Sequence, residues 1–381
     1  MTTWTETPRG DELPEEILTP WQHIGRGIRQ DRLAMWGVVA LLFFFALAVA
    51  GWWGTSGDNP YFSPSTVRLP DRFKPPLSKV NLQAVAPGEV PPMGMYLFGT
   101  DKLGRDVFAR MLEGTKIAMA VGFVAVGISM IIGIFMGGIA GFHGNRQIGP
   151  ASLLGAILFP VAGGFLFGGL SLWYLIPLEG ALIFTGALSG MWLESLPQLG
   201  FLQRYSLVNV DTIFIVLVDV QLSFPTFFLI LTAIAILPPS IWNIMIVIGL
   251  FGWVGPARFV RGEILSLRER PFIEAARAIG GSDMRLIFLH LVPNSLAAVL
   301  VSATIGVPSA ILSEAGLSFL GFGVPPPDAS WGNILSDGRF FLFDAPWLMV
   351  IPGIAILIVV LAFNLFGEGL REAMNPRSKP G

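Results

Sequence analysis

Few residues of this 381-residue chain have the chemistry and spacing of a reaction centre. There is no Cys, and the three His residues are isolated in the sequence, which disfavours a metal site. Four acids occur within or beside apolar stretches: Glu179, Asp211, Asp219 and Glu314. Acids inside a membrane are candidates for proton relays, but the stretch 205–257 holds no Lys or Arg to pair with them. We expect Asp211, Asp219 and Glu314 near the water interface, as caps or packing groups.

A second candidate is the spacing Gly99-x4-Gly104, which superficially matches a phosphate loop. It lacks the Lys and the Ser or Thr that follow in a nucleotide-binding loop, and no complete Walker A motif occurs anywhere in the chain. Any ATP must therefore be bound and hydrolysed by a partner. The segment itself predicts a turn leading into a short amphipathic helix, with Asp101 and Asp106 as candidate caps.

The most informative polar segment is 258–294, which lies between two apolar stretches and contains six Arg. Its composition favours a helix on either side of Gly280-Gly281, and so a helix, a tight turn and a second helix. Ala275 and Ala276 leave a low surface against which another protein could pack. Two interpretations stay open from the residues alone, a docking site for a partner and a plain solvated loop.

The composition indicates the elements that must carry these segments. Hydrophobic residues make up 53% of the chain and charged residues only 13%, whereas soluble domains carry about a quarter charged residues. The mean hydropathy is +0.67. A net charge of −2 excludes the basic footprint of a nucleic-acid-binding protein. The fold class predicted is an all-α polytopic membrane protein.

Six apolar stretches have the length of about 20 residues that a membrane-spanning helix needs. They are 33–52, 117–142, 212–237, 241–257, 295–313 and 345–367. The first follows 32 mostly polar residues without a small-residue cleavage site, so we expect it to remain as an anchor.

The region 147–205 does not fit a simple count of spans. Its apolar runs, 151–178 and 180–193, are long enough for an extra helical hairpin, with Glu179 at the turn. The alternative is a pair of interfacial or re-entrant pieces. We favour the hairpin, which preserves the orientation of the later spans.

Arg and Lys beside the spans set the orientation, because they are retained on the cytoplasmic side. Residues 1–32 are then a cytoplasmic tail, 33–53 the first transmembrane helix, and 54–116 an external Pro-rich loop with little core of its own. The membrane region 117–367 follows, with the segment 258–294 inside. The tail 368–381 also lies inside.

Gly133, Gly137 and Gly141 form consecutive small-xxx-small steps within the second predicted span. This spacing lets two membrane helices approach closely. We expect the three glycines to pack, either within this chain or against a second membrane chain of the same kind. The alternative is that Gly is simply frequent in membrane helices.

Glu274-Ala275-Ala276, Gly280 and Pro293 resemble the cytoplasmic "EAA" loop of ABC-importer permeases. In that family this loop sits in a groove of the ATP-hydrolysing subunit. The resemblance implies a docking role for Glu274, Ala275, Ala276, Arg277, Gly280, Gly281, His290 and Pro293. The usual aliphatic pair before the proline is here His290 and Val292, a departure found in the peptide-importer branch.

Three further segments are similar to dipeptide and oligopeptide permeases and to the related nickel permeases. They are 98–110 (FGTDKLGRDVFAR), 314–321 (EAGLSFLG) with 331–333 (WGN), and 369–377 (GLREAMNPR). The resemblance covers 33–377 except 147–205, where this chain has more residues than the family pattern.

The resemblance implies a type I ABC-importer permease fold with six core spans, and a chain that forms half of a pathway for peptides. The implied partners are a second homologous permease, two ABC ATPase subunits, an external substrate-binding protein and membrane lipid, with no nucleic acid. ATP and Mg would be bound by the ATPase subunits, and this chain would perform no catalysis. The implied location is the bacterial inner membrane.

Other functions stay open at this point. A nickel, metal-chelate or other small-solute importer would share the same permease features. An ion-coupled secondary transporter would need paired intramembrane charges and usually repeated halves, which the sequence lacks. A scaffold or assembly factor of the membrane is the remaining alternative, and its loop 258–294 would have no ATPase to bind.

Overall fold

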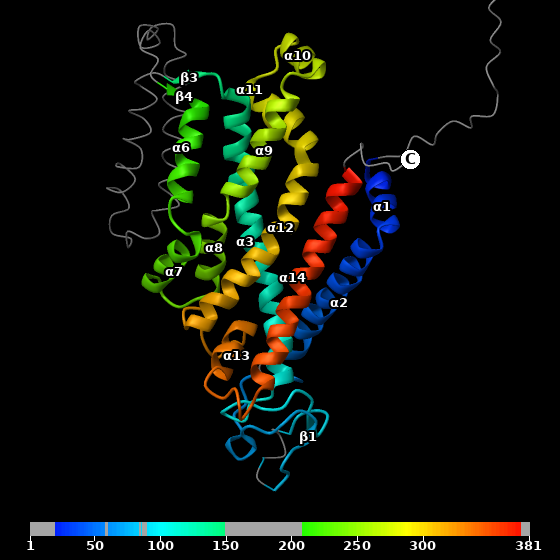
Figure 1. The fold of residues 1–381 in the computed structure, drawn as a ribbon, viewed down its shortest axis with the longest axis vertical. Coiled ribbons are helices and arrows are strands. Elements are labelled where there is room, and N and C mark those ends of the chain that lie inside the picture. The colour runs from blue at the N-terminus through cyan, green and yellow to red at the C-terminus, as the bar shows by residue number, and fades with distance from the viewer. Residues whose placement is uncertain (1–19, 58–59, 84, 86–89, 149–207, 375–381) are drawn as a thin grey trace, which may run out of the picture.

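In the computed structural model the chain forms a bundle of long helices (Figure 1). The structure describes residues 20–57, 60–83, 85, 90–148 and 208–374. Within this part, five helices are long and apolar enough to cross a membrane, and six if one bent pair counts as a single span. The predicted all-α polytopic membrane class is confirmed.

The bundle has two distinct ends (Figure 1). One end, here the hairpin end, carries α10 (Pro271–Ala278) and α11 (Asp283–Arg285). The opposite end, here the loop end, carries the strands β1 (Ser78–Lys79) and β2 (Met95–Tyr96), the short helix η1 (Leu69–Asp71) and the helix α13 (Trp331–Gly338).

The first long helix is α2 (Arg32–Thr55), preceded by α1 (Pro20–Gln30) at the hairpin end. Asp31 begins α2 by accepting the backbone N–H of Leu33 at 2.8 Å, an N-cap that satisfies an otherwise unpaired donor. α2 packs against α14 (Trp347–Met374), which has Pro352 in its interior. Large apolar side chains such as Trp36 remain exposed on α2, as suits a surface that faces lipid.

The second span belongs to α3 (Val107–His143), which is longer than the predicted apolar stretch 117–142. At about 1.5 Å per residue, its 37 residues extend about 55 Å, well beyond the hydrocarbon core. The expectation of a separate short helix after Gly104 is therefore wrong, because that segment leads directly into α3.

The span predicted at 212–237 is not one straight helix but a bent pair, α6 (Val210–Leu222) and α7 (Thr226–Ile236), with an angle of 75° between them. Pro225 at the start of α7 explains the break, since proline has no N–H to donate and disfavours a helical residue before it. The strands β3 (Gln147–Ile148) and β4 (Val208–Asn209) pair beside α6. The expected hairpin at 151–193 falls outside the described residues.

The fourth span is α8 (Ile241–Phe251) followed by α9 (Val254–Leu267), ten residues longer than predicted. Sequence reasoning ended it before Arg258 because charge is disfavoured in hydrocarbon. In the structure Arg261 pairs with Asp211 and Arg268 donates to the carbonyl oxygen of Gly141 at 3.0 Å. These partners let the helix continue with charged side chains.

The fifth span is α12 (Val292–Leu320), which follows the π-helix η5 (Leu286–Leu291) and has Pro308 in its interior. Gly321 ends it in the left-handed region with a φ of +91°, a helix C-terminus that glycine adopts without a Cβ penalty. The predicted stretch 295–313 lies entirely within α12, and the predicted stretch 345–367 begins two residues before α14 and otherwise lies within it. Both predictions gave the right position, and both helices are longer than predicted.

α3 lies at the centre of the bundle and packs against α2, α8, α9 and α12 (Figure 1). Gly133, Gly137 and Gly141 all face α9. A Cβ at Gly137 would collide with the carbonyl oxygen of Ala257, and one at Gly133 would reach the Pro256 side chain. The three glycines therefore allow the two helix backbones to lie in direct contact within this chain.

We expect Gly137→Ala to destabilise the protein by about 1–3 kcal/mol, because the added methyl group must displace the α9 backbone. Gly127→Ala is the matched control, since Gly127 lies on the same helix with nothing within 4 Å of its Cβ position. The measurement is the thermal unfolding midpoint of each purified variant in detergent. Equal midpoints for the two variants would refute the close contact.

Candidate functional site

The first candidate site is the hairpin of α10 and α11. Its turn is a Schellman motif, in which Gly281 N–H donates to the Ala276 carbonyl at 3.1 Å and Gly280 N–H to the Arg277 carbonyl at 3.0 Å. Gly280 has a φ of +87°, which favours glycine. Its Cβ position has nothing within 4 Å, so the strain of a substitution there would come from the backbone and not from a clash within the chain.

One face of the hairpin packs against the helix bundle, and the opposite face is exposed. Ile273, Leu286 and Ile287 are almost completely buried and fix it to the bundle. Glu274, Ala275 and the side chains around them lie on the exposed face, where Ile279 is 88% exposed. Apolar side chains also exposed at this end are Phe272, Met284 and Leu289. An exposed apolar group rimmed by Arg is typical of a protein contact.

Three contacts connect the hairpin to α3. The Arg277 guanidinium lies 5.5 Å from the centre of the Phe142 ring, in a cation–π contact. His143 Nε2 lies 3.8 Å from Asp283 Oδ2. Phe135 and Phe288 stack with their ring centres 5.9 Å apart. A displacement of the hairpin therefore acts directly on one end of α3.

The structure separates the eight residues assigned by the resemblance. Glu274 to Gly281 gather on the hairpin, whereas His290 and Pro293 lie on the connection to α12. The predicted second short helix is continuous with the fifth span through η5. Pro293 cannot donate a backbone hydrogen bond, which accompanies the local widening to a π-helix.

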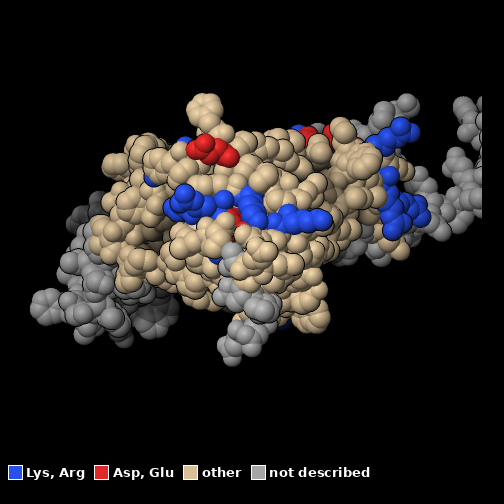
Figure 2. Space-filling model, turned by 90° about the horizontal axis from the view of Figure 1, so that it is seen from below, with Lys and Arg blue, Asp and Glu red and all other residues tan. Residues whose placement is uncertain are grey.

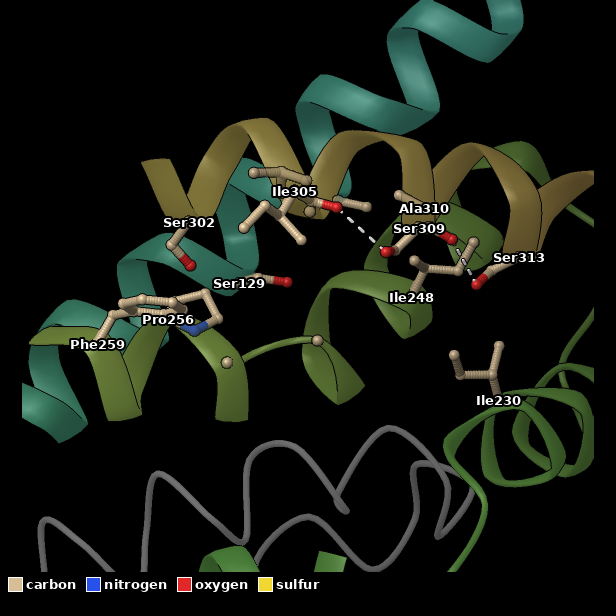
Figure 3. A pocket seen from close by; sticks show the side chains of 15 residues that line it. Ser129, Ile230, Ile248, Pro256, Phe259, Ser302, Ile305, Ser309, Ala310 and Ser313 are labelled. Carbon is tan, nitrogen blue, oxygen red and sulfur yellow. Dashed lines mark hydrogen bonds between the residues drawn. The ribbon is translucent and has the colours of Figure 1, made fainter. Parts of the chain in front are cut away.

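The second candidate site is a cavity of about 230 Å³ within the bundle, between α3, α7, α8, α9 and α12 (Figure 3). No charged side chain is among the described residues that line it. Four serines line it: Ser129, Ser302, Ser309 and Ser313. Three of them donate to backbone carbonyls: Ser129 to Gly249 at 2.8 Å, Ser309 to Ile305 at 3.1 Å and Ser313 to Ser309 at 2.7 Å.

Helix α12 contributes one stripe to this cavity. Its lining residues are Ser302, Ile305, Gly306, Ser309, Ala310 and Ser313, at the spacing of one helical face. Ile305 and Ser309 are exposed in this chain, and Ser313 is half-buried. Sequence reasoning did not identify the cavity, and the signal that could have found it is this Ser and Gly periodicity inside an apolar span. The stripe is a polar and incompletely covered surface on a membrane helix.

A third cluster ties the loop end together. The buried carboxylate of Asp101 accepts from Arg105 Nε and from Arg110 Nη1, each at 2.6 Å. Arg110 also contacts Asp337 Oδ2 at 3.1 Å and Asn333 Oδ1 at 3.1 Å, on α13. Burial would raise the pKa of Asp337, but Arg110 and Lys102 outweigh it and hold that pKa below its usual value. Breaking one partner of such a buried network leaves another charge uncompensated.

The two predicted caps have different roles. Asp106 is the N-cap of α3 and accepts from Phe108 N–H at 2.9 Å. Asp101 caps no helix, which corrects the prediction. It accepts the backbone N–H groups of Leu103 and Arg105, each at 2.9 Å, and so closes the turn at Gly104.

Segment 54–116, expected to be a loop with little core of its own, has one small cluster of buried side chains in its described part. Val80, Val85 and Tyr96 pack together, and β1 pairs with β2. Tyr96 Oη donates to the buried Asp71 at 2.8 Å. Burial would raise the pKa of Asp71, but hydrogen bonds from Lys74, Tyr96 and the Asn81 amide outweigh it and lower that pKa.

Two of the acids in or beside apolar stretches have side-chain partners. Glu314 is 1% exposed and accepts from Ser318 Oγ at 2.6 Å, as expected of a polar packing group. Asp211 has a basic partner after all, because Arg261 of α9 donates to both of its carboxylate oxygens at 2.6 and 2.7 Å. No group of three His, Cys, Asp or Glu among the described residues could hold a metal.

The fold and these sites define a class of multi-pass membrane permeases. Comparison with known proteins agrees. Residues 198–380 match the family described as "Binding-protein-dependent transport system inner membrane component", and residues 19–76 match the N-terminal transmembrane domain of oligopeptide transport permease C. This chain belongs to the binding-protein-dependent permease family.

Its relatives align over almost their full length. A dipeptide transport system permease protein of Alkalihalophilus pseudofirmus is 31% identical over 98% of this chain and 96% of its own. An oligopeptide transport system permease protein of Bacillus subtilis is 28% identical over 96% and 93%. A glutathione transport system permease protein of Escherichia coli is 29% identical over 96% and 93%.

Asp106 generates a pH prediction. Burial raises its pKa to about 6, even though the Phe108 amide and Arg68 favour the charged form. Because the folded pKa lies above the unfolded value of 3.8, the associated stability is present below pH 3.8 and is lost as the pH rises through 6. We expect the protein to lose up to about 3 kcal/mol from this group between pH 4 and 7.

Asp106→Asn is the matching variant, since Asn is an equally good N-cap but does not titrate. The measurement is denaturant unfolding of both proteins in detergent between pH 4 and 7. The difference in unfolding free energy between them should change with pH. A constant difference would contradict a titrating Asp106.

Proposed function

We propose that this chain forms one half of the translocation pathway of an ABC importer that takes up peptides. The serine-lined cavity is the observation that carries the proposal, because its uncharged lining provides hydroxyl groups without selecting for a charged side chain. The names of the dipeptide, oligopeptide and glutathione relatives support a substrate with peptide bonds. A second, homologous permease would cover the exposed stripe of α12 and complete the pathway.

The orientation proposed places the hairpin end in the cytoplasm and the loop end outside. Arg26, Arg29 and Arg32 flank the first span at the hairpin end, where α9, α10 and α11 add further Arg. Arginine in short segments beside spans is retained on the cytoplasmic side. Both tails, 1–32 and 368–381, would then be cytoplasmic, and 117–367 would be the permease domain with the insertion 147–205.

Two ABC ATPase subunits would bind ATP and Mg, and one would dock on the hairpin of this chain. Glu274 to Gly281 present an exposed face of the size and mixed character that a groove on another protein can receive. The contacts of Arg277 and Asp283 with the end of α3 give closure of the ATPases a route into the bundle. This is a two-state element biased from both sides of the membrane.

Gly280→Val tests the docking role. A β-branched residue at a φ of +87° is strained by about 1–3 kcal/mol, so the turn should shift and present the hairpin at a different angle. We expect uptake and recovery of the ATPase with the tagged permease to fall about 5- to 150-fold. Membrane insertion should survive, because the spans are untouched.

Gly25→Val is the control, since Gly25 lies on α1 with open space around its Cβ position. Glu274→Ala should be milder than Gly280→Val, because an exposed carboxylate contributes little unless it pairs across the interface. Full uptake and full ATPase recovery in Gly280→Val would exclude this hairpin as the docking site.

Ser309→Phe tests the pathway. The ring would occupy much of the cavity of about 230 Å³, and we expect uptake to fall at least about tenfold while the ATPase and the second permease are still recovered. Ser309→Ala should retain uptake, since the hydroxyl group already bonds to the Ile305 carbonyl. Normal uptake in Ser309→Phe would place the pathway elsewhere.

A further inference from the structure

Within segment 60–106 of the loop end, acidic and basic side chains differ in their burial. In the described part of segment 60–106 all three acids are buried: Asp71 is 0% exposed, Asp101 0% and Asp106 5%. Of the six bases in the same part, only Arg68 is buried. The other five, Arg72, Lys74, Lys79, Lys102 and Arg105, reach the surface and are here called the basic band. Figure 2 shows Lys and Arg side chains gathered in one band across this end of the molecule.

This separation has a physical cause. A carboxylate accepts hydrogen bonds, so it can satisfy the backbone N–H groups of a loop that has little regular structure. Asp71 accepts from Asn81 N–H, Asp101 from Leu103 and Arg105 N–H, and Asp106 from Phe108 N–H. Lys and Arg have no acceptor for these donors, and their long side chains carry the charge to water. Burial of the three acids therefore leaves a surface that is more basic than the composition of the segment.

The segment that carries the basic band lies at the loop end, beyond the ends of α3 and α14 (Figure 1). Viewed along the bundle, it occupies the middle of the exposed face rather than its rim (Figure 2). Lipid headgroups surround a membrane protein at the sides of its helices. A surface at the end of the bundle is instead accessible to a protein that approaches from the aqueous side.

We propose that the basic band is the contact by which this permease receives its external substrate-binding protein, through an acidic surface of that protein. The inference rests on the proposed function, which places the loop end outside and makes uptake depend on a binding protein. Complementary charge at such an exposed contact raises the association rate and fixes orientation more than it adds affinity. The encounter should therefore weaken with ionic strength.

The band is built on the same groups that hold the loop end together. Lys102 and Arg105 contact Asp337 of α13 at 2.8 and 3.1 Å. A partner that binds Lys102 and Arg105 would therefore compete for Asp337, which also pairs with Arg110 at the start of α3. Arg72 and Lys79 are different, because they are exposed and have no acidic side chain as a partner among the described residues. They can be changed without breaking the network.

The experiment compares the complete importer with its Arg72→Glu/Lys79→Glu double variant, in detergent and in proteoliposomes. The binding protein encoded with the transporter is titrated, and the stimulated ATPase rate gives its half-saturating concentration. We expect that concentration to rise about tenfold in the variant at low salt, with the maximal rate unchanged. The wild type should approach the variant as NaCl is raised.

Two controls separate charge from other effects. Arg72→Lys/Lys79→Arg keeps the charge and should behave as the wild type. Arg29→Glu changes one exposed charge at the opposite end and should leave the half-saturating concentration unchanged. Equal values in the wild type and the double Glu variant would overturn the proposal. So would a defect that appears only in anionic proteoliposomes and not in detergent, because the band would then bind lipid. A wild-type complex that no binding protein stimulates would instead contradict the proposed function.

Discussion

The close contact between α3 and α9 is the constraint on which the rest of the structure depends. Lipid offers no hydrophobic driving force between helices, so their association relies on close packing. Gly133, Gly137 and Gly141 remove the side chains that would hold the two backbones apart. Once α9 lies against α3, Arg261 reaches Asp211 and Arg268 reaches the end of α3. A charged helix can therefore continue beyond the apolar stretch and lead into the hairpin.

α3 also connects the two functional ends of the molecule. At the hairpin end Phe142 and His143 contact Arg277 and Asp283. At the loop end Arg110, in the first turns of the same helix, joins the loop to α13. Between them Ser129 lines the cavity. A single rigid element thus touches the proposed ATPase contact, the proposed pathway and the network beneath the basic band, which is the arrangement that an ATP-driven transporter requires.

The hairpin and the cavity show different limits of sequence reasoning. The turn at Gly280 was predictable, because a glycine pair between helix-forming residues weakens the helix and can adopt the positive φ of a helix C-terminus. The structure gives Gly280 a φ of +87°. Pro225 also indicated the break of the third span, but the prediction of one helix followed the uninterrupted apolar composition around it. The Ser and Gly spacing of α12 was visible in the sequence, but the cavity as a whole was not predictable, because its lining comes from five helices whose packing the sequence does not give.

The sequence by itself determined the membrane class, the position of most spans and the family motifs, because hydrocarbon thickness and backbone hydrogen bonding leave few choices for long apolar stretches. Only the tertiary structure decided which charges are paired. Asp211 finds Arg261 fifty residues away, and Glu314 becomes buried against Ser318. It also decided that the described acids of segment 60–106 are buried while five of its six bases reach the surface. Burial and partners are properties of the packed chain, since the local sequence fixes neither the distance nor the solvent around a charge.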